Sequence, residues 1–368
     1  MYIKKIQLNQ FRNLSEVDFL FFQGLNIIYG ENGVGKTSIL EAIYFLSFTK
    51  SFKSKKDRDL IQKGKGYFQI STQWNLEDDQ EIKVKGNYLK TGEKKFFYSD
   101  IEIKNNSEMI GKIPIVFQSP EDYVITSTGS KYKRQYFDKL ISQISKEYLK
   151  DLLNYRKLLK QKNAYLKILA KRKQFYSDEQ IDVYNEQILP IMWRIYSKRK
   201  ATIEEFNIQF KEMFKETISK KSEVEIEYKP SIYGDTLNSF SERYYSKTKD
   251  SISKEIAMHH SMYGVNYDRI NFYRESTPVE NFASQGEHKL WMNIMKLTEG
   301  QIIKEKKGQE PIFLLDDVFA ELDISNSQKI IEKIKQQKQV IVTATDLNNL
   351  HSLGIDTKST NVHIIELK

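Results

Sequence analysis

"GLNIIYGENGVGKTSIL", residues 24–40, decides the fold of this chain. Residues 30–37, "GENGVGKT", fit the phosphate-loop pattern G-x-x-x-x-G-K-[ST] between an apolar strand and a helix predicted over 37–48. Glycines let successive backbone N–H groups face one point, where the start of the helix adds partial positive charge. Lys36 is expected to reach the terminal phosphates of ATP, and the Thr37 hydroxyl to ligate Mg²⁺. The expected ATP contacts are Gly30, Glu31, Asn32, Gly33, Val34, Gly35, Lys36, Thr37 and Ser38.

A second motif near the other end of the chain supplies carboxylates for the same site. In "PIFLLDDVFAELD", residues 311–323, the apolar run predicts a buried strand with Asp316 at its carboxyl end, where open α/β sheets bind ligands. Asp316 is expected to hold Mg²⁺, directly or through water. Asp317 would orient or deprotonate the attacking water, or it would only tune Asp316.

The predicted secondary structure changes twice along the chain, so the two motifs lie in different regions. Residues 1–125 are strand-rich, with strands expected at 68–74, 81–85 and 96–98; residues 126–270 are helical and basic. Residues 271–368 return to α/β, with strands at 311–315 and 339–344 and a helix at 325–337. A long helix is expected at 177–218, kinked or broken at Pro190. We therefore predict an α/β head assembled from 1–125 and 271–368, with an inserted, mostly helical arm at 126–270.

The charge of the chain is concentrated in the predicted arm. The net charge is +9 at pH 7, and fourteen lysines and arginines lie between residues 131 and 173 against three acidic residues. This pattern favours a polyanion partner over a merely lysine-rich composition, and both DNA and an acidic protein remain open as that partner. The expected DNA contacts are Lys131, Lys133, Arg134, Arg156, Lys157 and Lys160. The helical spacing of Tyr132, Tyr136, Tyr148 and Tyr155 favours core packing over stacking on bases.

Composition narrows the class of protein further. The chain has no cysteine, which excludes disulfides, thiolate metal sites and cysteine catalysis. It contains no signal-peptide core and no apolar run of membrane-spanning length, so we expect a cytoplasmic protein without a membrane partner.

One helix start near residue 285 combines a cap with a possible phosphate site. In "ASQGEHKLW", residues 283–291, Ser284 and Glu287 have the spacing of a capping box. Gly286 is unfavourable inside a first turn. The N–H groups around Gly286 would remain available to a phosphate while Ser284 caps the helix.

Together these motifs resemble a known family. "FRNL" (11–14), the phosphate loop, the Ser-x-Gly helix start and "LLDDVFAELD" (314–323) resemble the ABC-type heads of SMC-like ATPases. "IVFQSPEDYVI" (115–125) and "GSKYKRQYFDKLI" (129–141) are similar to the bacterial RecF family of DNA replication and repair proteins. The family's Gly-Pro-His-Arg-Asp-Asp stretch is matched at "GVNYDR" (264–269) only by Gly264 and Asp268.

The resemblance implies roles for further residues. Arg12 and Asn13 would approach the nucleotide, and Gln118 would sit near Mg²⁺ and the attacking water. Ser284, Gln285 and Gly286 would form the signature motif, which contacts ATP bound by a second subunit. The D-loop would include Asp323, and the switch position would be Asp346. From the residues alone, the preferred interpretation of Gln118 is a loop hydrogen-bonder, and that of Asp346 is a helix cap. Glu287 departs from the family's usual Gln.

The resemblance also implies a function. An ATP-driven homodimer would clamp DNA at single-strand gaps and junctions during repair and the SOS response, hydrolyse ATP slowly under DNA stimulation, and support recombinase loading with the mediators RecO and RecR. The alternatives are another SMC-like head from an antiphage or nuclease system, a transporter-type ATP-binding subunit, and a non-hydrolysing switch on the same fold.

Overall fold

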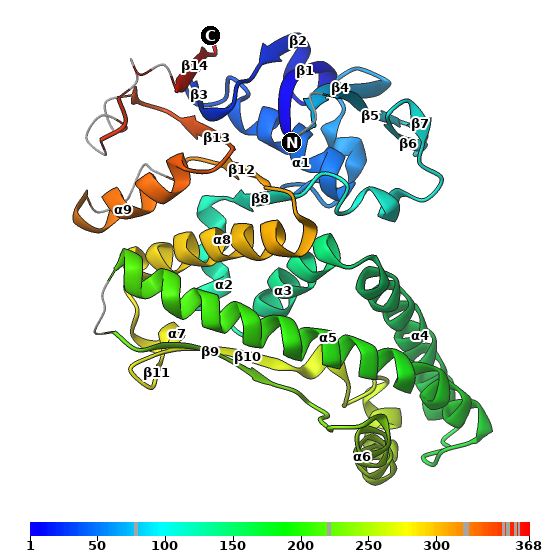
Figure 1. The fold of residues 1–368 in the computed structure, drawn as a ribbon. Coiled ribbons are helices and arrows are strands. Elements are labelled where there is room, and N and C mark those ends of the chain that lie inside the picture. The colour runs from blue at the N-terminus through cyan, green and yellow to red at the C-terminus, as the bar shows by residue number, and fades with distance from the viewer. Residues whose placement is uncertain are drawn as a thin grey trace. The chain divides into compact units, whose positions relative to one another are not determined.

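The computed structural model describes residues 1–368 except 77–79, 219–221, 319–323, 348–349, 351–353, 357–358 and 360. The chain forms two compact units (Figure 1). The head unit comprises Met1–Ser127, Glu212–Ser222 and Ala283–Lys368, and the arm unit comprises Thr128–Lys211 and Glu223–Phe282. Within the described residues no helix is both long and apolar enough to cross a membrane.

These units differ from the predicted domains in two segments. Glu212–Ser222 is counted with the head unit because Phe214 packs on Trp291 with ring centroids 5.9 Å apart, and Lys333 pairs with Glu216 at 2.8 Å. The segment after residue 270 stays in the arm unit because β10 (Arg269–Arg274) pairs along its whole length with β9 (Val224–Lys229). Neither the contacts of Glu212–Ser222 nor the pairing of β10 with β9 could be predicted from the local sequence pattern.

Two sheets build the head unit. A five-stranded sheet has the order β14-β3-β13-β12-β8, and all its pairs are parallel. Its strands are β3 (Gly24–Tyr29), β8 (Ile115–Gln118), β12 (Ile312–Leu315), β13 (Gln339–Ala344) and β14 (Val362–Glu366). An antiparallel sheet has the order β2-β1-β4-β5-β6-β7. Its strands are β1 (Tyr2–Phe11), β2 (Leu14–Leu20), β4 (Tyr67–Asn75), β5 (Glu81–Leu89), β6 (Lys94–Tyr98) and β7 (Ile101–Glu102).

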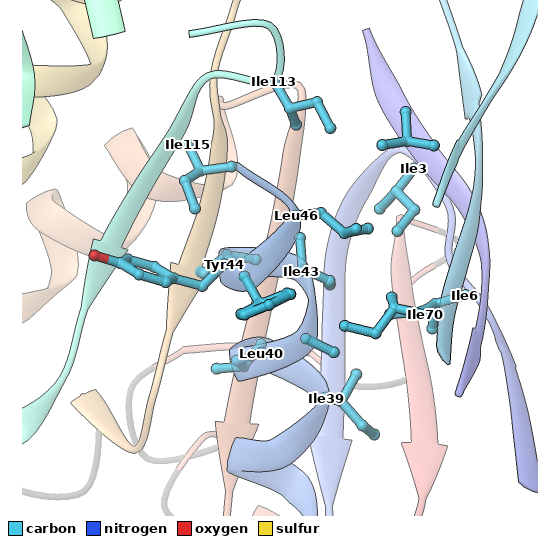
Figure 2. Close-up of a cluster of buried hydrophobic side chains, with 14 of the residues drawn as sticks. Ile3, Ile6, Ile39, Leu40, Ile43, Tyr44, Leu46, Ile70, Ile113 and Ile115 are labelled. Carbon is cyan, nitrogen blue, oxygen red and sulfur yellow. The ribbon is translucent and has the colours of Figure 1, made fainter. Parts of the chain in front are cut away.

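Helix α1 (Lys36–Phe48) joins these sheets through one core. Ile39 and Ile43 of α1 cluster with Ile6 of β1 and Ile70 of β4, while Ile115 of β8 belongs to the same cluster (Figure 2). Eleven of the thirteen α1 residues are buried. The helix is therefore apolar nearly all round, as a helix between two layers must be. Because the phosphate loop opens directly into α1, this core fixes the loop in place.

The head unit contains further helical segments besides α1. They are α2 (Val124–Ser127), α8 (Gln285–Lys307), α9 (Ile324–Lys335) and the 3₁₀ turns η1 (Asp57–Leu60), η2 (Asn106–Met109) and η3 (Pro120–Tyr123). At Gly300 of α8, an added Cβ would lie 2.5 Å from the Phe313 ring of β12. Only glycine therefore allows α8 to pack this closely on the sheet that carries Asp316.

The arm unit is mostly helical, as predicted. Its elements are α3 (Ser130–Ile144), α4 (Lys146–Lys171), α5 (Glu179–Thr217), β9, η4 (Val265–Tyr267), β10, β11 (Thr277–Pro278), α6 (Leu237–Met258) and α7 (Val279–Phe282), and α5 ends in the head unit. Pro190 lies inside α5, which continues through it as a single helix, so the predicted break does not occur. Tyr136, Tyr148 and Tyr155 are buried, which confirms core packing for them; Tyr132 is 44% exposed.

A buried ionic network lies at the centre of the arm unit. Arg199 of α5 is 2% exposed and pairs with Asp138 of α3 and with Asp268, each at 2.8 Å. Tyr148 donates a hydrogen bond to Asp138 at 2.5 Å, and the Tyr228 hydroxyl donates one to Asp268 at 2.5 Å. Burial raises the pKa of Asp268, while Arg199 and the Tyr228 hydrogen bond act in the opposite direction. The network ties α3, α4, α5 and β9 to residue 268.

Candidate nucleotide-binding site

The phosphate loop has the backbone that the glycine spacing predicts. Gly30 and Gly35 have φ values of 155° and 114°. A Cβ at Gly30 would lie 2.3 Å from the Leu367 carbonyl oxygen, and one at Gly35 would lie 2.7 Å from Leu14. Lys36 is buried, and its ammonium group donates hydrogen bonds to the carbonyl oxygens of Gly30 at 2.6 Å and Glu31 at 2.9 Å. The charged group is thus held within the loop, where an anion would be bound.

Thr37, the residue after Lys36, contacts Asp316 from the C-terminal part of the chain. Thr37 donates a hydrogen bond from Oγ1 to Asp316 Oδ1 at 2.8 Å, and Thr343 of β13 donates to the same oxygen at 2.9 Å. Burial raises the pKa of Asp316, and the hydrogen bonds from Thr37 and Thr343 oppose that shift. The arrangement places a hydroxyl and a carboxylate at the carboxyl end of the parallel sheet.

These oxygens suit Mg²⁺. Hydroxyl and carboxylate oxygens are the ligands of this hard cation, which usually takes one or two protein carboxylates and completes its shell with water and phosphate oxygens. In the part of the chain that the structure describes, no group of three or more His, Asp or Glu side chains is placed to hold a metal by itself. Thr37 and Asp316 therefore fit a metal that binds together with a nucleotide.

Asp317 has an unusual conformation beside this pair. Its φ is +49°, in the left-handed region that residues other than glycine seldom adopt outside special sites. Its backbone N–H donates to Thr343 Oγ1 at 2.9 Å. Its side-chain Oδ1 is buried with no hydrogen-bond partner in the structure. A buried carboxylate oxygen without a partner is a suitable acceptor for a proton of water.

Gln118 ends β8, the strand that pairs directly with β12 and so lies next to the strand that leads to Asp317. At the end of β8, its backbone carbonyl accepts a hydrogen bond from Asp316 N at 2.9 Å, and its Nε2 donates to Asn293 Oδ1 of α8 at 2.7 Å. Gln118 and Asp317 line the same cavity, which has a volume of about 200 Å³. The link from Gln118 to the helix that begins at the signature motif was not predicted, because Asn293 lies in the middle of α8 without any local motif.

Arg12 and Asn13 both border the phosphate loop but in different roles. Asn13 donates to the Gly33 carbonyl at 2.9 Å and accepts from Ser38 Oγ at 3.2 Å. Arg12 donates through Nε and Nη2 to the buried carboxylate of Glu41, at 2.8 and 2.7 Å. Asn13 thus braces the loop directly, whereas Arg12 is anchored on α1.

A cavity of about 1020 Å³ extends from these residues. Its lining includes Arg12, Asn13, Thr37 and Ser38. The sequence motifs did not identify the other lining residues, which are Ser15, Glu41, Lys53, Asp59, Ile61, Gln62, Lys63 and Lys65. The available signal was the lysine-rich stretch 50–65 that follows α1. The size and the basic lining of this cavity suit the remainder of a nucleotide.

Helix α8, at the predicted signature motif, begins as its capping box predicts. Ser284 Oγ accepts from Glu287 N at 3.3 Å, and the Glu287 carboxylate accepts from Ser284 N at 2.8 Å. Gln285 and Gly286 are exposed. The Glu287 carboxylate therefore completes the cap. The first turn offers a helix start at the surface, where N–H groups lack partners within the helix.

The other predicted site residues differ in their exposure to solvent. Asp346 is exposed just after β13, and Asp323 lies outside the described residues. In the arm unit Lys131, Arg156, Lys157 and Lys160 are exposed. Arg134 is half-buried and donates to the Asp268 carbonyl at 2.5 Å. Lys133 is only 2% exposed and pairs with Glu280 at 2.8 Å, so its prediction as a DNA contact was wrong: a charge buried in an ion pair cannot reach a phosphate in solvent.

Comparisons with known proteins agree with this architecture. Residues 2–360 match the family model described as RecF/RecN/SMC N terminal domain. The chain is 32% identical over 348 residues to the DNA replication and repair protein RecF of Clostridium novyi, covering 94% of both chains. It is 32% identical over 338 residues to the protein of the same name from Flavobacterium johnsoniae, covering 92% of this chain and 91% of the relative.

Solved structures of other proteins are also similar to the structure of this chain. A structure of the recombination mediator protein RecF-ATPrS in the RecFOR pathway has a TM-score of 0.89 and 27% identity, covering all of this chain and 96% of that one. An Smc head bound to the C-winged helix domain of ScpA, with a TM-score of 0.53 and 17% identity over 96% and 92% of the two chains, shares the fold. The predicted ABC-type head with its inserted arm is confirmed, and the transporter-type and other SMC-like alternatives are set aside. The chain belongs to the RecF family of DNA replication and repair proteins, which are ATP-binding ATPases of the ABC type.

Proposed function

We propose that ATP binding closes two copies of the head unit into a dimer that clamps DNA, and that hydrolysis releases the DNA. The observation that carries this proposal is the exposed first turn of α8, at Ser284, Gln285 and Gly286. A helix start is a ready-made phosphate site, and the phosphate loop of the same chain already has a helix start of its own in α1. The exposed turn is therefore assigned to ATP held by a second copy.

The hydrolytic roles follow from the contacts around Asp316. Lys36 and the loop N–H groups bind the phosphates, and Mg²⁺, held by Thr37 and Asp316 with Gln118 nearby, neutralises their charge when bound. Asp317 accepts the proton of the attacking water, and Gln118 orients that water. Asp346 and Asp323 are assigned to the switch position and the D-loop. We propose slow, DNA-stimulated turnover, and the retained set of Lys36, Thr37, Asp316 and Asp317 argues against a non-hydrolysing switch.

The DNA contacts are assigned to exposed basic residues of the arm unit. Arg156, Lys157 and Lys160 are exposed on α4, and Lys131 is exposed on α3. Contacts of this kind bind phosphates without reading sequence and weaken steeply with salt. Because a solved relative is described as a recombination mediator of the RecFOR pathway, we propose that this chain acts at gapped and junction DNA with RecO- and RecR-type mediators to support recombinase loading.

Replacing Ser284 with arginine tests the shared site. ATP binding to each monomer should survive, whereas ATP-dependent dimerisation and hydrolysis should fall to background, because a bulky cation blocks the close approach of the helix start to the partner's phosphates. Dimerisation is measured by light scattering and nucleotide binding by calorimetry.

The matched control for this variant is Thr236→Arg. Thr236 caps α6 in the arm unit with the same kind of capping box, so this change removes an equivalent cap without touching the signature turn. It should leave dimerisation unchanged. If Ser284→Arg dimerises with ATP as well as the unmodified chain does, the shared-site proposal is wrong.

A further inference from the structure

A second cavity lies within the arm unit, separate from the residues of the nucleotide site. Its volume is about 800 Å³. Four segments line it: the start of α3, the end of β9 with the residues that follow, Lys247 of α6, and residues between Met262 and Arg269. We call this cavity the arm pocket.

Its lining is strongly basic. Lys131, Arg134, Lys229, Lys247 and Arg269 line the arm pocket, and no acidic residue of the described chain does. Lys229 forms an ion pair with Glu227, with Nζ and Oε2 2.9 Å apart. For the exposed side chain of Arg269 no ion pair or hydrogen bond is present among the described residues. The positive charge of the pocket is therefore mostly uncompensated.

Two of these cations are placed against each other in the sheet. Arg269 of β10 is directly opposite Lys229 of β9 in the antiparallel register. Like charges in directly opposite positions destabilise a strand pair. An anion bound between them would relieve this repulsion, so the pair is better explained by a ligand than by the stability of the fold.

The first turn of α3 is a second place in the pocket where a bound anion would be favourable. Gly129 is the N-cap of this fifteen-residue helix and provides no side-chain cap. A Cβ built at Gly129 would meet nothing within 4 Å. The N–H groups of the first turn of a helix lack partners within the helix and favour an anion.

Tyrosines lie among the cations. Tyr132 and Tyr267 of the lining are 44% and 38% exposed, and Lys247 Nζ lies 5.3 Å from the ring centroid of Tyr263. A site for a simple inorganic anion has no use for exposed aromatic rings, whereas unpaired nucleobases stack on them.

We propose that the arm pocket binds one unpaired nucleotide of a DNA strand, with its phosphate among Arg269, Lys229 and the start of α3, and its base against the exposed ring of Tyr132. The volume lies within the usual range for a small-molecule site, about 300–1,000 Å³, which admits a single nucleotide but not a base-paired duplex. The inference rests on the DNA-binding function proposed above and adds a preference for single strands to it.

Binding of fluorescent oligodeoxythymidylate and of a blunt duplex to the full chain tests this proposal. Tyr132→Ala should weaken single-strand binding by about five-fold or more, the usual effect of losing one base stack, and leave duplex binding unchanged. Tyr132→Phe keeps the ring and should bind like the unmodified chain. Tyr176→Ala removes another exposed tyrosine of the arm unit, 67% exposed and outside the pocket, and should have no effect.

Charge and location are tested on the same proteins. Arg269→Gln should reduce the slope of log affinity against log salt for the single strand by about 0.7, the change expected for one lost phosphate contact. Photocrosslinking with an oligonucleotide that carries 5-iododeoxyuridine should map to the peptide containing Tyr132.

The outcomes separate the two proposals. If the unmodified chain dimerises with ATP and binds duplex DNA, but Tyr132→Ala and Arg269→Gln bind the single strand normally, the arm pocket is not a nucleotide site and the clamp stands. If the variants lose single-strand binding while ATP induces no dimer, the pocket stands and the clamp fails. If the unmodified chain does not bind the single strand, or if an acidic peptide competes as well as an oligonucleotide of equal charge, the pocket proposal is wrong.

Discussion

Replacing Lys36 with methionine is expected to weaken ATP binding by about 100-fold or more. The ammonium group of Lys36 is held in the phosphate loop by the carbonyl oxygens of Gly30 and Glu31, and the phosphate-loop pattern assigns this cation to the terminal phosphates. With ATP bound, Lys36 is expected to donate hydrogen bonds to phosphate oxygens instead. Each hydrogen bond to a charged group contributes about 1.5–3 kcal/mol, so the absence of two such bonds to phosphate accounts for this effect. Isothermal titration calorimetry with ATP and Mg²⁺ measures it directly.

Lys50→Met is the matched control for this prediction. Lys50 is exposed, lies two residues after α1 and does not line the nucleotide cavity. Its replacement should leave ATP affinity within about two-fold, given the weak energetics of exposed charges. Both variants should unfold at the temperature of the unmodified chain. An affinity of Lys36→Met close to that of the control would show that the loop does not bind the nucleotide.

Replacing Arg199 with methionine is expected to destabilise the arm unit by about 3–5 kcal/mol. Removing one partner from a buried ion pair leaves an uncompensated buried charge, which accounts for a cost of this size. In this chain the change leaves the carboxylates of Asp138 and Asp268 buried together, 9% and 1% exposed, without their shared cation. Urea unfolding measures the cost, and hydrogen exchange at α3, α4 and α5 locates it in the arm unit.

The same helix supplies the comparison for Arg199. Arg194 of α5 forms a two-pronged pair with Asp151, at 2.8 and 2.7 Å, but its side chain is 53% exposed. Arg194→Met should therefore cost no more than about 1 kcal/mol. Equal losses of stability for the two variants would contradict the role assigned to the buried network.

The sequence predicted the nucleotide site because each of its parts is encoded locally. The glycine spacing specifies the loop of residues 30–37, the apolar run 311–315 specifies a buried strand, and both end at the carboxyl edge of one parallel sheet. The bond between Thr37 and Asp316 follows from that topology. The capping box of Ser284 and Glu287 is equally local, and both of its hydrogen bonds are present.

What the sequence did not predict depends on contacts between distant segments. The burial of Lys133 depends on Glu280, and the position of Arg12 depends on Glu41. The arm pocket combines four separate segments, of which only the start of α3 lies in the basic run 131–173. Charge counting identified the run but could not distinguish lysines that face solvent from those that stabilise the core. An interior proline removes one backbone hydrogen bond and either kinks or breaks a helix, so Pro190 alone did not decide between these outcomes. The helix α5 continues through Pro190.

In the proposed mechanism, ATP closes two head units around shared nucleotides. Light scattering on the Asp317→Asn variant tests it most directly, with ATP, ADP or no nucleotide and with or without gapped DNA. The variant retains the size of Asp317 and should bind ATP without hydrolysing it. We predict a stable dimer with ATP and gapped DNA, and a monomer with ADP or without nucleotide. A variant that remains monomeric with ATP and gapped DNA would contradict the clamp mechanism.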